Sequence, residues 1–313
     1  MDSAGTSPCF SSLEEILNFE KAAPPMRMAV AAPHDSTTLR AVAMAVQHRV
    51  ALPILIGSRE IIEQRADEAG LDLSACTIEN VEEGQHITHA VQMLHDHQAD
   101  FMMKGLVQTS KLLRTVLDKQ WGLSSSRLMS HVTVFEHPKE HRLILMTDAG
   151  VNVNPNVARK IDILQNAVEV AIALGIAKPR VAILAAVESV QLPAMPATLH
   201  GELIKRYAAG GLLKQPCYVD GPLALDNAVS PAKAAAKGIG GPVAGQADVL
   251  VLPNIESGNI FYKALTSLHG DEMAGVVVGT RCPLVVPSRA DSPMTKLFCI
   301  ALASYLSRGR NGH

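Results

Sequence analysis

Short apolar runs alternate with amphipathic segments of helical length along most of this 313-residue sequence. Residues 28–32, 52–56, 77–81 and 100–104 have the composition of buried strands, and a segment that predicts a helix follows each run. Parallel strands need such helical crossovers, so the alternation predicts a parallel α/β sheet. Aromatic residues make up only 4% of the chain against 48% apolar residues, which is typical of sheets covered by helices on both faces.

The alternation is interrupted between residues 132 and 146. Val132 to Phe135 and Leu143 to Met146 both have strand character, and a polar segment at 137–141 separates them. This spacing predicts a β-hairpin, which we expect at a domain seam or on a dimer surface. The alternation of helices and strands then resumes with a helix expected from Val157.

Charge and composition exclude several classes of protein. The 28 Lys and Arg residues nearly balance 30 Asp and Glu residues, so nothing favours binding to nucleic acid or to an anionic membrane. No apolar run approaches the ~18 residues that cross a bilayer, and the first residues do not resemble a secretory signal. Five cysteines without a CxxC pair indicate reduced thiols. We expect a cytoplasmic protein with small-molecule ligands.

The first junction suited to an anionic ligand follows the strand expected at 100–104. Ligands of parallel sheets bind beyond the carboxyl ends of the strands, and free N–H groups at a helix start favour anions. Lys104 ends this strand, and Thr109 and Ser110 stand at the start of the next helix. Arg114 lies one turn further along. The alternative is an ordinary Thr or Ser helix cap with a surface arginine.

A second junction follows the strand expected at 249–252. Ser257, Gly258 and Asn259 are expected to open a helix that carries Lys263 one turn in. Gly258 would let a phosphate group approach the backbone closely, because glycine has no side chain. The alternative is again a capped loop without a ligand.

The third junction precedes the last helix, expected at 293–306. Ser288, Arg289 and Asp291 place a hydroxyl group, a guanidinium and a carboxylate on one turn at a helix start. Asp291 or Ser292 can serve as the N-cap, whereas Arg289 has no local structural reason to be there. Three such turns in one chain indicate a phosphate-bearing ligand.

The remaining motifs give weaker signals. His86 and His89 lie three residues apart on an expected helix, but no neighbouring cysteine or carboxylate completes a set of metal ligands. We interpret these histidines as part of a solvated helix face and expect no metal site. The sequence contains neither a GxSxG nucleophile elbow nor a Walker A motif.

Several longer segments resemble those of one enzyme family. They are KGLVQTSKLLRTVLD, SHVTVFE, VDGPLALDNAVSP, GGPVAGQADVLVLPNIESGNIFYKAL and VVPSRADSPMTKLFCIALA. These segments resemble the phosphate acetyl/butyryltransferases, and the butyryltransferase branch more than the acetyltransferase branch. The resemblance runs from about Met28 to Leu306, which is nearly the whole chain.

The resemblance implies a reaction and a fold. The reaction is reversible transfer of an acyl group between coenzyme A (CoA) and orthophosphate in a ternary complex, with no metal and no cofactor beyond CoA as a substrate. The fold is a two-lobed, three-layer α/β structure similar to isocitrate and isopropylmalate dehydrogenases, with a cleft between the lobes. Residues 1–149 and 276–313 would form the first lobe and 150–275 an inserted second lobe. A homodimer or higher homo-oligomer is also implied.

The resemblance also assigns roles to the candidate residues. Ser288 and Arg289 match the family's Ser-Arg pair, so we expect Arg289 to bind the phosphoryl group and Ser288 to donate to the developing oxyanion. Arg114 matches, less closely, a second arginine that binds phosphate or CoA. The other candidates for binding CoA or phosphate are Lys104, Thr109, Ser110, Ser257, Gly258, Asn259 and Lys263.

One position departs from the pattern of the acetyltransferase branch. That branch carries an Asp seven positions after the Ser, which is proposed to deprotonate the thiol of CoA. This chain has Thr295 there, and a threonine cannot act as a base at neutral pH. Asp291 is the nearest carboxylate in the sequence, and we expect it to assist the thiol or to orient Arg289.

Two other functions compete with acyl transfer. The same fold occurs as a non-catalytic, acyl-CoA-sensing domain in some malic enzymes, but the intact Ser288-Arg289 pair favours an enzyme. A dehydrogenase of the related fold would need metal-binding aspartates and an arginine-rich carboxylate clamp, which we do not find. The branch resemblance favours butyryl over acetyl and propionyl groups, although one or two methylenes change binding by only about 1–3 kcal/mol.

Overall fold

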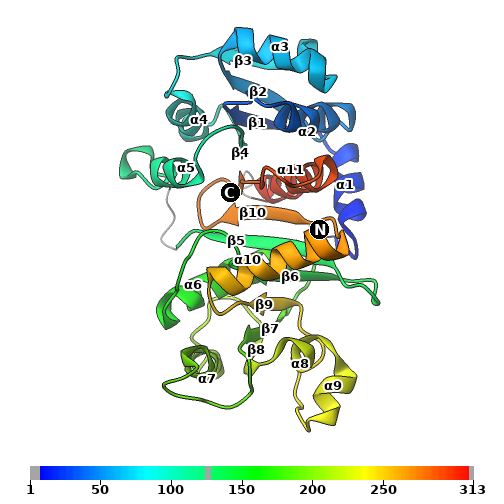
Figure 1. Ribbon diagram of the computed structural model, residues 1–313, viewed down its shortest axis with the longest axis vertical. Helices are drawn as coiled ribbons and strands as arrows, with labels where there is room; N and C mark the ends of the chain where they lie inside the picture. The colour runs from blue at the N-terminus through cyan, green and yellow to red at the C-terminus, as the bar shows by residue number, and fades with distance from the viewer. Residues whose placement is uncertain (1–7, 124–127, 310–313) are drawn as a thin grey trace, which may run out of the picture. The chain divides into compact units, whose positions relative to one another are not determined.

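The expected apolar runs form strands, and the segments between them form helices (Figure 1). The structure is a computed structural model that describes residues 8–123 and 128–309. The predicted α/β class is confirmed. By their contacts the residues divide into two units. We name Leu13–Arg127 with Glu272–His313 the terminal unit, and Leu128–Asp271 with Met1–Ser12 the middle unit.

The strands of the terminal unit follow the order β3-β2-β1-β4-β11-β10. All neighbours are parallel except β10 and β11, which are antiparallel. Ala31 at the end of β1 pairs with Ile56 of β2 and Lys104 of β4, so these strands end at one edge. The strands are β1 Met26–Ala31, β2 Ala51–Gly57, β3 Thr77–Asn80, β4 Phe101–Lys104, β10 Ala274–Val278 and β11 Leu284–Val285.

Helices cover both faces of these strands. One series packs as α1 on α11, α11 on α2 and α2 on α3, while α4 packs on α5 on the other side (Figure 1). The inner strands β1, β2 and β4 are largely buried, as a sheet covered on both faces requires, whereas the edge strand β3 is not. The helices are α1 Leu13–Ala22, α2 Ser36–Gln47, α3 Arg59–Ala69, α4 His86–His95, α5 Thr109–Val116 and α11 Pro293–Arg308, with single turns at Leu73–Ala75 and Lys119–Trp121.

The middle unit begins with the hairpin expected from the sequence. Its strands follow the order β5-β6-β9-β7-β8, in which β5 and β6 are antiparallel and the other neighbours are parallel. The predicted hairpin is therefore confirmed. The strands are β5 Ser130–Glu136, β6 Leu143–Thr147, β7 Arg180–Leu184, β8 Tyr218–Leu223 and β9 Val249–Val251.

The helices of the middle unit pack on these strands and on each other. α6 contacts β5, β6 and β9, α7 contacts β7 and β8, and α8 contacts β7. The helices are α6 Val157–Ala173, α7 Pro196–Ala209, α8 Leu225–Val229, α9 Pro231–Ala236 and α10 Ile255–Lys263, which continues into a π-type turn at Ala264–His269. Within the part of the chain that the structure describes, no helix could span a membrane.

The unit bounds differ from those of the lobes implied by the resemblance. The hairpin belongs to the middle unit because β6 pairs with β9, so this unit begins at Leu128 rather than at residue 150. It ends at Asp271, close to the expected residue 275. The lobes of 1–149 with 276–313 and of 150–275, and the cleft between them, stay predictions.

Candidate active site

Three loops of the terminal unit begin at the carboxyl edge of its parallel strands. β1, β4 and β11 are consecutive in the strand order and run in the same direction. The loops that follow Ala31, Lys104 and Val285 therefore start next to one another. This edge is where open parallel sheets bind their ligands.

The loop after β1 is fixed by Asp35, the N-cap of α2. Its Oδ1 accepts hydrogen bonds from the Thr38 N–H (2.8 Å) and the Thr37 hydroxyl (2.6 Å), and its Oδ2 accepts one from the Thr38 hydroxyl (2.7 Å). Burial opposes ionisation of Asp35, but these bonds and the charge of Lys296 outweigh burial and lower its pKa. The carboxylate is thus negative and firmly held.

The loop after β11 is a tight turn that starts at Ser288. The Asp291 Oδ2 accepts a hydrogen bond from the Ser288 N–H (2.7 Å), and the Asp291 N–H donates to the Ser288 carbonyl (3.2 Å). Ser292 is the N-cap of α11 and accepts from the Thr295 N–H (2.9 Å). Of the two caps that the sequence allowed, Ser292 is therefore the actual one, and Asp291 holds the Ser288 turn.

Lys104, the last residue of β4, is buried, with only 8% of its surface exposed. Its Nζ donates to the carbonyl groups of Gly105 (3.2 Å) and Val107 (3.4 Å). Burial lowers the pKa of Lys104, and the charge of Arg289 lowers it further. Two neighbouring cations repel each other, and a bound anion would relieve this repulsion, so such a pair is typical of an anion-binding site.

Lys296 lies in the first turn of α11 and is only 2% exposed. Its Nζ donates to the Thr37 hydroxyl (2.9 Å), so this lysine links α11 to the loop after β1. Burial lowers the pKa of Lys296, while the carboxylates of Asp35 and Asp291 act in the opposite direction.

These side chains surround one small cavity of about 210 Å³. Three cations and one carboxylate line it, together with hydroxyl groups, so its net charge favours an anion. The Ser288 side chain lies beside the cations, where it can donate to an oxygen atom. The lining residues are Asp35, Thr37, Thr38, Lys104, Gly105, Leu106, Pro287, Ser288, Arg289 and Lys296. We name this space the phosphate cavity.

Gly105 brings two walls of the phosphate cavity together. Its N–H donates to the Ala31 carbonyl (2.9 Å), and the Leu106 N–H donates to the Ala32 carbonyl (2.8 Å). A Cβ atom at Gly105 would lie 2.2 Å from the Ala32 carbonyl oxygen, so only glycine fits here. Ala32 itself has a φ of 53°, which is uncommon for a residue with a side chain. Such backbone strain concentrates at functional sites.

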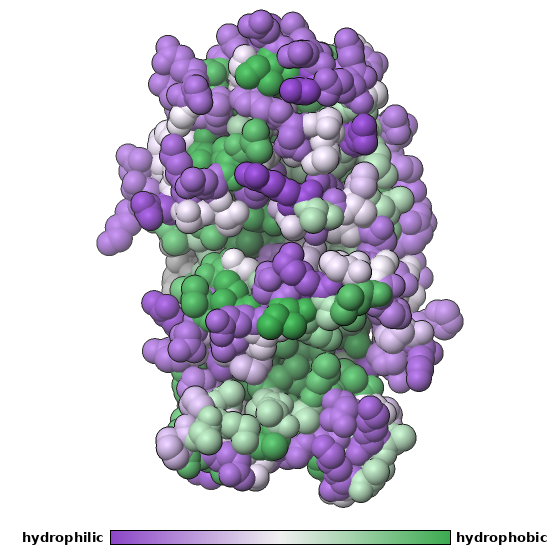
Figure 2. Space-filling model, in the orientation of Figure 1, coloured by the Kyte–Doolittle hydropathy of each residue, from purple (hydrophilic) through white to green (hydrophobic). Residues whose placement is uncertain are grey.

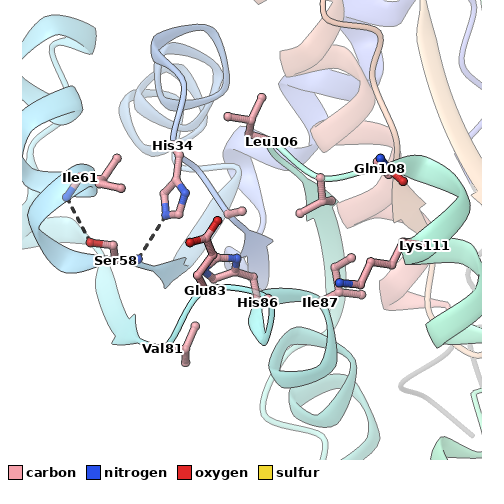
Figure 3. Close-up of a pocket in the computed structure, with 13 residues that line it drawn as sticks. His34, Ser58, Ile61, Val81, Glu83, His86, Ile87, Leu106, Gln108 and Lys111 are labelled. Atoms are coloured by element: carbon pink, nitrogen blue, oxygen red, sulfur yellow. Dashed lines mark hydrogen bonds between the residues drawn. The ribbon is translucent and has the colours of Figure 1, made fainter.

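A larger cavity of about 720 Å³ adjoins the phosphate cavity, and Leu106 lines both (Figure 3). Figure 3 shows His34, Glu83 and His86 close together in it, with apolar side chains around them. We name it the histidine cavity. The lining residues are Ala32, His34, Ser58, Ile61, Val81, Glu83, Gly84, His86, Ile87, Leu106, Val107, Gln108 and Lys111.

The surroundings of the two histidines in this cavity favour the neutral form. The His34 Nε2 accepts a hydrogen bond from the Ser58 N–H (3.1 Å), and the two imidazole rings meet edge to face with centroids 5.1 Å apart. Burial lowers the pKa of His34, and the neighbouring His86 lowers it further. Burial also lowers the pKa of His86, against the opposing charge of Glu83. A neutral imidazole can accept a proton from a substrate.

A comparison with known families identifies the family of this chain. The family model described as "Phosphate acetyl/butaryl transferase" matches residues 84–304, which include both Lys104 and the Ser288-Arg289 turn. The chain belongs to this family.

Individual relatives agree with the family assignment. The phosphate butyryltransferase of Clostridium acetobutylicum is 42% identical over 297 residues, covering 95% of this chain and 98% of that protein. The phosphate acetyltransferase of Thermotoga maritima is 37% identical over 278 residues, covering 89% of this chain and 94% of that protein. A branched-chain phosphotransacylase from Enterococcus faecalis V583 superposes with a TM-score of 0.79 at 30% identity, covering 90% of this chain and 99% of that one. The family membership and the butyryltransferase-like sequence are therefore confirmed.

The structure brings only part of the predicted site together in this member of the phosphate acetyl/butyryl transferase family. Lys104, Ser288 and Arg289 line the phosphate cavity, whereas Thr109, Ser110 and Arg114 line neither of the two cavities described above. The Thr or Ser cap considered as an alternative is wrong. The N-cap of α5 is Gln108, whose side chain makes no capping hydrogen bond. The binding roles of the three α5 residues stay predictions.

The second predicted junction lies in the middle unit and begins earlier than expected. Asn254 caps α10 and forms a capping box with Ser257, so the helix starts at Ile255 and not at Asn259. A lone SGN segment does not reveal this cap, because the capping residue stands three positions before Ser257. Lys263 is consequently the last residue of α10, far from its N-terminus, and is exposed. The expected place of Lys263 one turn into the helix is wrong.

Gly258 has a packing reason to be glycine. A Cβ atom there would lie 2.6 Å from the Asp148 carbonyl oxygen and 2.9 Å from the Cα of Ala149. The Asn259 side chain donates to the Ala149 carbonyl at 3.5 Å. The close approach of α10 to this loop explains the glycine without a ligand, and a role of Ser257, Gly258 or Asn259 in binding stays a prediction.

Four residues of these cavities were not assigned to a site from the sequence. The interpretation of His86 as part of a solvated helix face is wrong, because this residue is only 7% exposed. Asp35 and Lys296 line the phosphate cavity, and His34 and His86 face each other in the histidine cavity. A signal for His34 and Asp35 was available, because both directly follow the strand expected at 28–32. The pairing of that strand with the one ending at Lys104 was not foreseen.

Proposed function

We propose that this protein transfers a short acyl group reversibly between CoA and orthophosphate, with butyryl as the favoured group and acetyl or propionyl as alternatives. The observation that carries the proposal is the convergence of Lys104, Arg289 and Lys296 with Ser288 around one cavity of phosphate-binding character. The family membership and the butyryltransferase relatives support it.

The phosphate cavity supplies what the attacking group needs. Arg289 binds orthophosphate through its forked donors, and the two buried lysines neutralise the remaining negative charge. A phosphate oxygen attacks the thioester carbonyl, a C–O bond forms, and the carbonyl oxygen becomes an oxyanion to which the Ser288 hydroxyl donates. Collapse of this intermediate breaks the C–S bond, and CoA leaves as the thiolate. Much of the rate enhancement then comes from holding two anionic substrates in contact.

The histidine cavity suits the thioester end of acyl-CoA. It adjoins the phosphate cavity and combines apolar walls with groups that exchange protons. In the reverse direction the thiol must lose a proton before it attacks acyl phosphate. The neutral imidazole of His86 can take this proton, whereas the acceptor nitrogen of His34 is engaged by the Ser58 N–H. Asp291 keeps Ser288 in place through its backbone hydrogen bond.

Three further properties belong to this proposal. The exchange of a thioester for an acyl phosphate changes no oxidation state, so it needs no redox cofactor. The family resemblance also implies no metal, and we therefore expect no cofactor beyond CoA and full activity in the presence of EDTA. Ile260 and Leu268 are 69% and 87% exposed, and apolar side chains over α10 in Figure 2 favour a homodimer or a higher homo-oligomer. A thiol substrate and five cysteines without a CxxC pair favour a cytoplasmic location.

Release of free thiol tests the proposal directly. Acetyl-, propionyl- and butyryl-CoA are each incubated with and without orthophosphate, and kcat/KM is measured for the wild type and for Arg289→Ala. We expect phosphate-dependent release that is fastest with butyryl-CoA and falls at least 100-fold in Arg289→Ala. Arg65→Ala removes an exposed guanidinium of the same unit and serves as the matched control, with activity within twofold of the wild type.

The outcomes separate the two functions that the sequence left open. Phosphate-dependent release that Arg289→Ala abolishes supports the transferase. Tight binding of acyl-CoA without thiol release from any of the three substrates would instead support a non-catalytic acyl-CoA-sensing protein.

A further inference from the structure

The middle unit has a polar cavity of its own, at the carboxyl edge of its parallel strands. β6, β7 and β9 are neighbours and end at the same level, since Val251 of β9 pairs with both Thr147 and Ile183. The loops that follow these strands enclose about 280 Å³. The polar residues of its lining are Asn154, Lys160, His200 and Asn254. None of these residues has a role in the acyl transfer described above.

Lys160 on α6 is the most unusual residue of this cavity. Only 1% of its surface is exposed, and within the described ranges its Nζ has no hydrogen bond and no ion pair. No carboxylate lines the cavity. Burial alone lowers the pKa of Lys160, to about 8. A buried ammonium group without a counter-ion is costly, so such a group is normally paired.

His200 on α7 also lines this cavity. Its Nδ1 is buried and has no hydrogen-bond partner among the residues that the structure describes. Burial lowers the pKa of His200, and the charge of Lys160 lowers it further. Two nitrogen groups that repel each other as cations would both be stabilised by one anion between them.

The asparagines complete a set of donors around the cavity. Asn254 uses its Oδ1 to cap α10, where it accepts from the Ser257 N–H (3.0 Å), so its amide group is left for another partner. Asn154 brings a second side-chain amide. The N-terminus of α10 starts at this point and adds the favourable end of its dipole. Everything polar in this lining therefore suits an anion.

We propose that this cavity of the middle unit is a second phosphoryl-anion site, in which Lys160 and His200 bind the anion. It is distinct in sequence and in lining from the phosphate cavity of the terminal unit. The choice of a phosphoryl group rests on the proposed function, whose substrates are orthophosphate and CoA. Both substrates carry this chemistry, and the experiment distinguishes between them.

Binding of radiolabelled orthophosphate, measured by equilibrium dialysis without acyl-CoA, tests the site. The starting protein is the double variant Arg289→Ala/Lys296→Met, which removes two cations of the phosphate cavity. We expect it to retain one saturable site for orthophosphate. Adding Lys160→Met weakens this binding at least tenfold. Adding Lys233→Met, which removes an exposed lysine of the same unit, changes it less than twofold.

Two results would overturn the proposal. One is the absence of saturable orthophosphate binding in the double variant. The other is equal binding after Lys160→Met and Lys233→Met. Because no turnover is involved, either result leaves acyl transfer by the wild type unaffected, and a failure of acyl transfer leaves this binding measurable. If Lys160→Met does not fold by circular dichroism, His200→Phe removes the other donor and must weaken binding at least threefold.

Competition identifies the occupant once the site is found. Displacement of labelled orthophosphate by CoA but not by dephospho-CoA assigns the site to the 3′-phosphate of CoA. Displacement by both assigns it to the pyrophosphate group. Displacement by neither, at concentrations that saturate the protein with CoA, assigns it to free orthophosphate. Each of these results supports a phosphoryl-anion site.

Discussion

The Thr295 hydroxyl donates a hydrogen bond to the carboxylate of Glu272 and accepts one from the Met273 N–H at 3.2 Å. Ser292, the N-cap of α11, donates a second hydroxyl hydrogen bond to the same carboxylate (2.6 Å). Glu272 thus joins the segment before β10 to the first turn of α11. Thr295, which stands where the acetyltransferase branch carries an aspartate, is part of a structural contact that already contains a carboxylate.

This contact predicts that aspartate is not tolerated at position 295. Thr295→Asp would place a second carboxylate against Glu272 in a buried position, and we expect it to lower the free energy of unfolding by about 1–3 kcal/mol. Thr295→Val, which removes both hydrogen bonds without adding charge, separates the two causes. Urea unfolding at pH 7 measures the stability of each variant.

A second substitution checks that the loss comes from repulsion. Adding Glu272→Gln to Thr295→Asp removes one of the two charges, so the double variant should be more stable than Thr295→Asp alone. Equal or lower stability of the double variant would show that the two carboxylates do not interact.

We predict that a side chain at position 105 distorts the phosphate cavity. In Gly105→Ala the added Cβ meets the Ala32 carbonyl oxygen, so the loop after β4 must move away from β1. We expect the KM for orthophosphate to rise at least tenfold and the stability to fall by about 2 kcal/mol. Gly240→Ala is the matched control, since a Cβ there meets no atom within 4 Å. Equal KM values for the two variants would contradict the role of Gly105.

We predict that Asp291→Asn and Asp291→Ala differ in their effect on kcat. Its Oδ2 accepts from the Ser288 N–H, and an asparagine can keep this hydrogen bond whereas an alanine cannot. We expect kcat of Asp291→Asn to stay within about tenfold of the wild type, and kcat of Asp291→Ala to fall further. Equally low rates for both variants would indicate that the negative charge is required, as for a base acting on the thiol.

Because Lys160 is buried, we predict that the free energy of unfolding depends on pH. Its pKa is about 8 in the folded protein against 10.5 for an ordinary lysine, so the unfolded chain binds more protons between these values. Stability therefore rises as the pH increases from 8 to 10.5. Lys160→Met lacks this dependence, and we expect it to exceed the wild type by about 3 kcal/mol at pH 7 and by less at pH 10.

Urea unfolding at the two pH values measures this effect. Lys233→Met provides the control, because an exposed lysine keeps its ordinary solvation in the folded protein. A stability difference between Lys160→Met and the wild type that is the same at pH 7 and pH 10 would mean that Lys160 is not destabilised by burial.

Local patterns in the sequence predict most of the elements but not all of their ends. The apolar runs at 28–32 and 52–56 and the hairpin at 132–146 appear as strands, because burial on both faces imposes a recognisable composition. The start of α10 was misplaced because Asn254 caps it by a capping box that involves Ser257 rather than Glu or Gln. The short helix α8, Leu225–Val229, has too few residues to show a helical period.

The site was predictable where its residues are neighbours in the sequence. Ser288 and Arg289 share one turn, and Lys104 ends a predicted strand. Asp35 and Lys296 reach the same cavity from positions 261 residues apart, through the adjacency of β1, β4 and β11. Strand order follows from tertiary packing, which a single sequence does not reveal. The contact between Thr295 and Glu272 could not be predicted either, because it also depends on tertiary packing.

In the proposed reaction Lys104, Arg289 and Lys296 bind the phosphate that attacks the thioester, and the decisive measurement is the steady-state kinetics of Lys296→Met. Lys296 touches the phosphate cavity but not the histidine cavity. We predict that kcat/KM for orthophosphate falls at least 100-fold, while the KM for butyryl-CoA stays within about twofold. An unchanged kcat/KM for orthophosphate in Lys296→Met would show that this lysine does not bind the attacking phosphate.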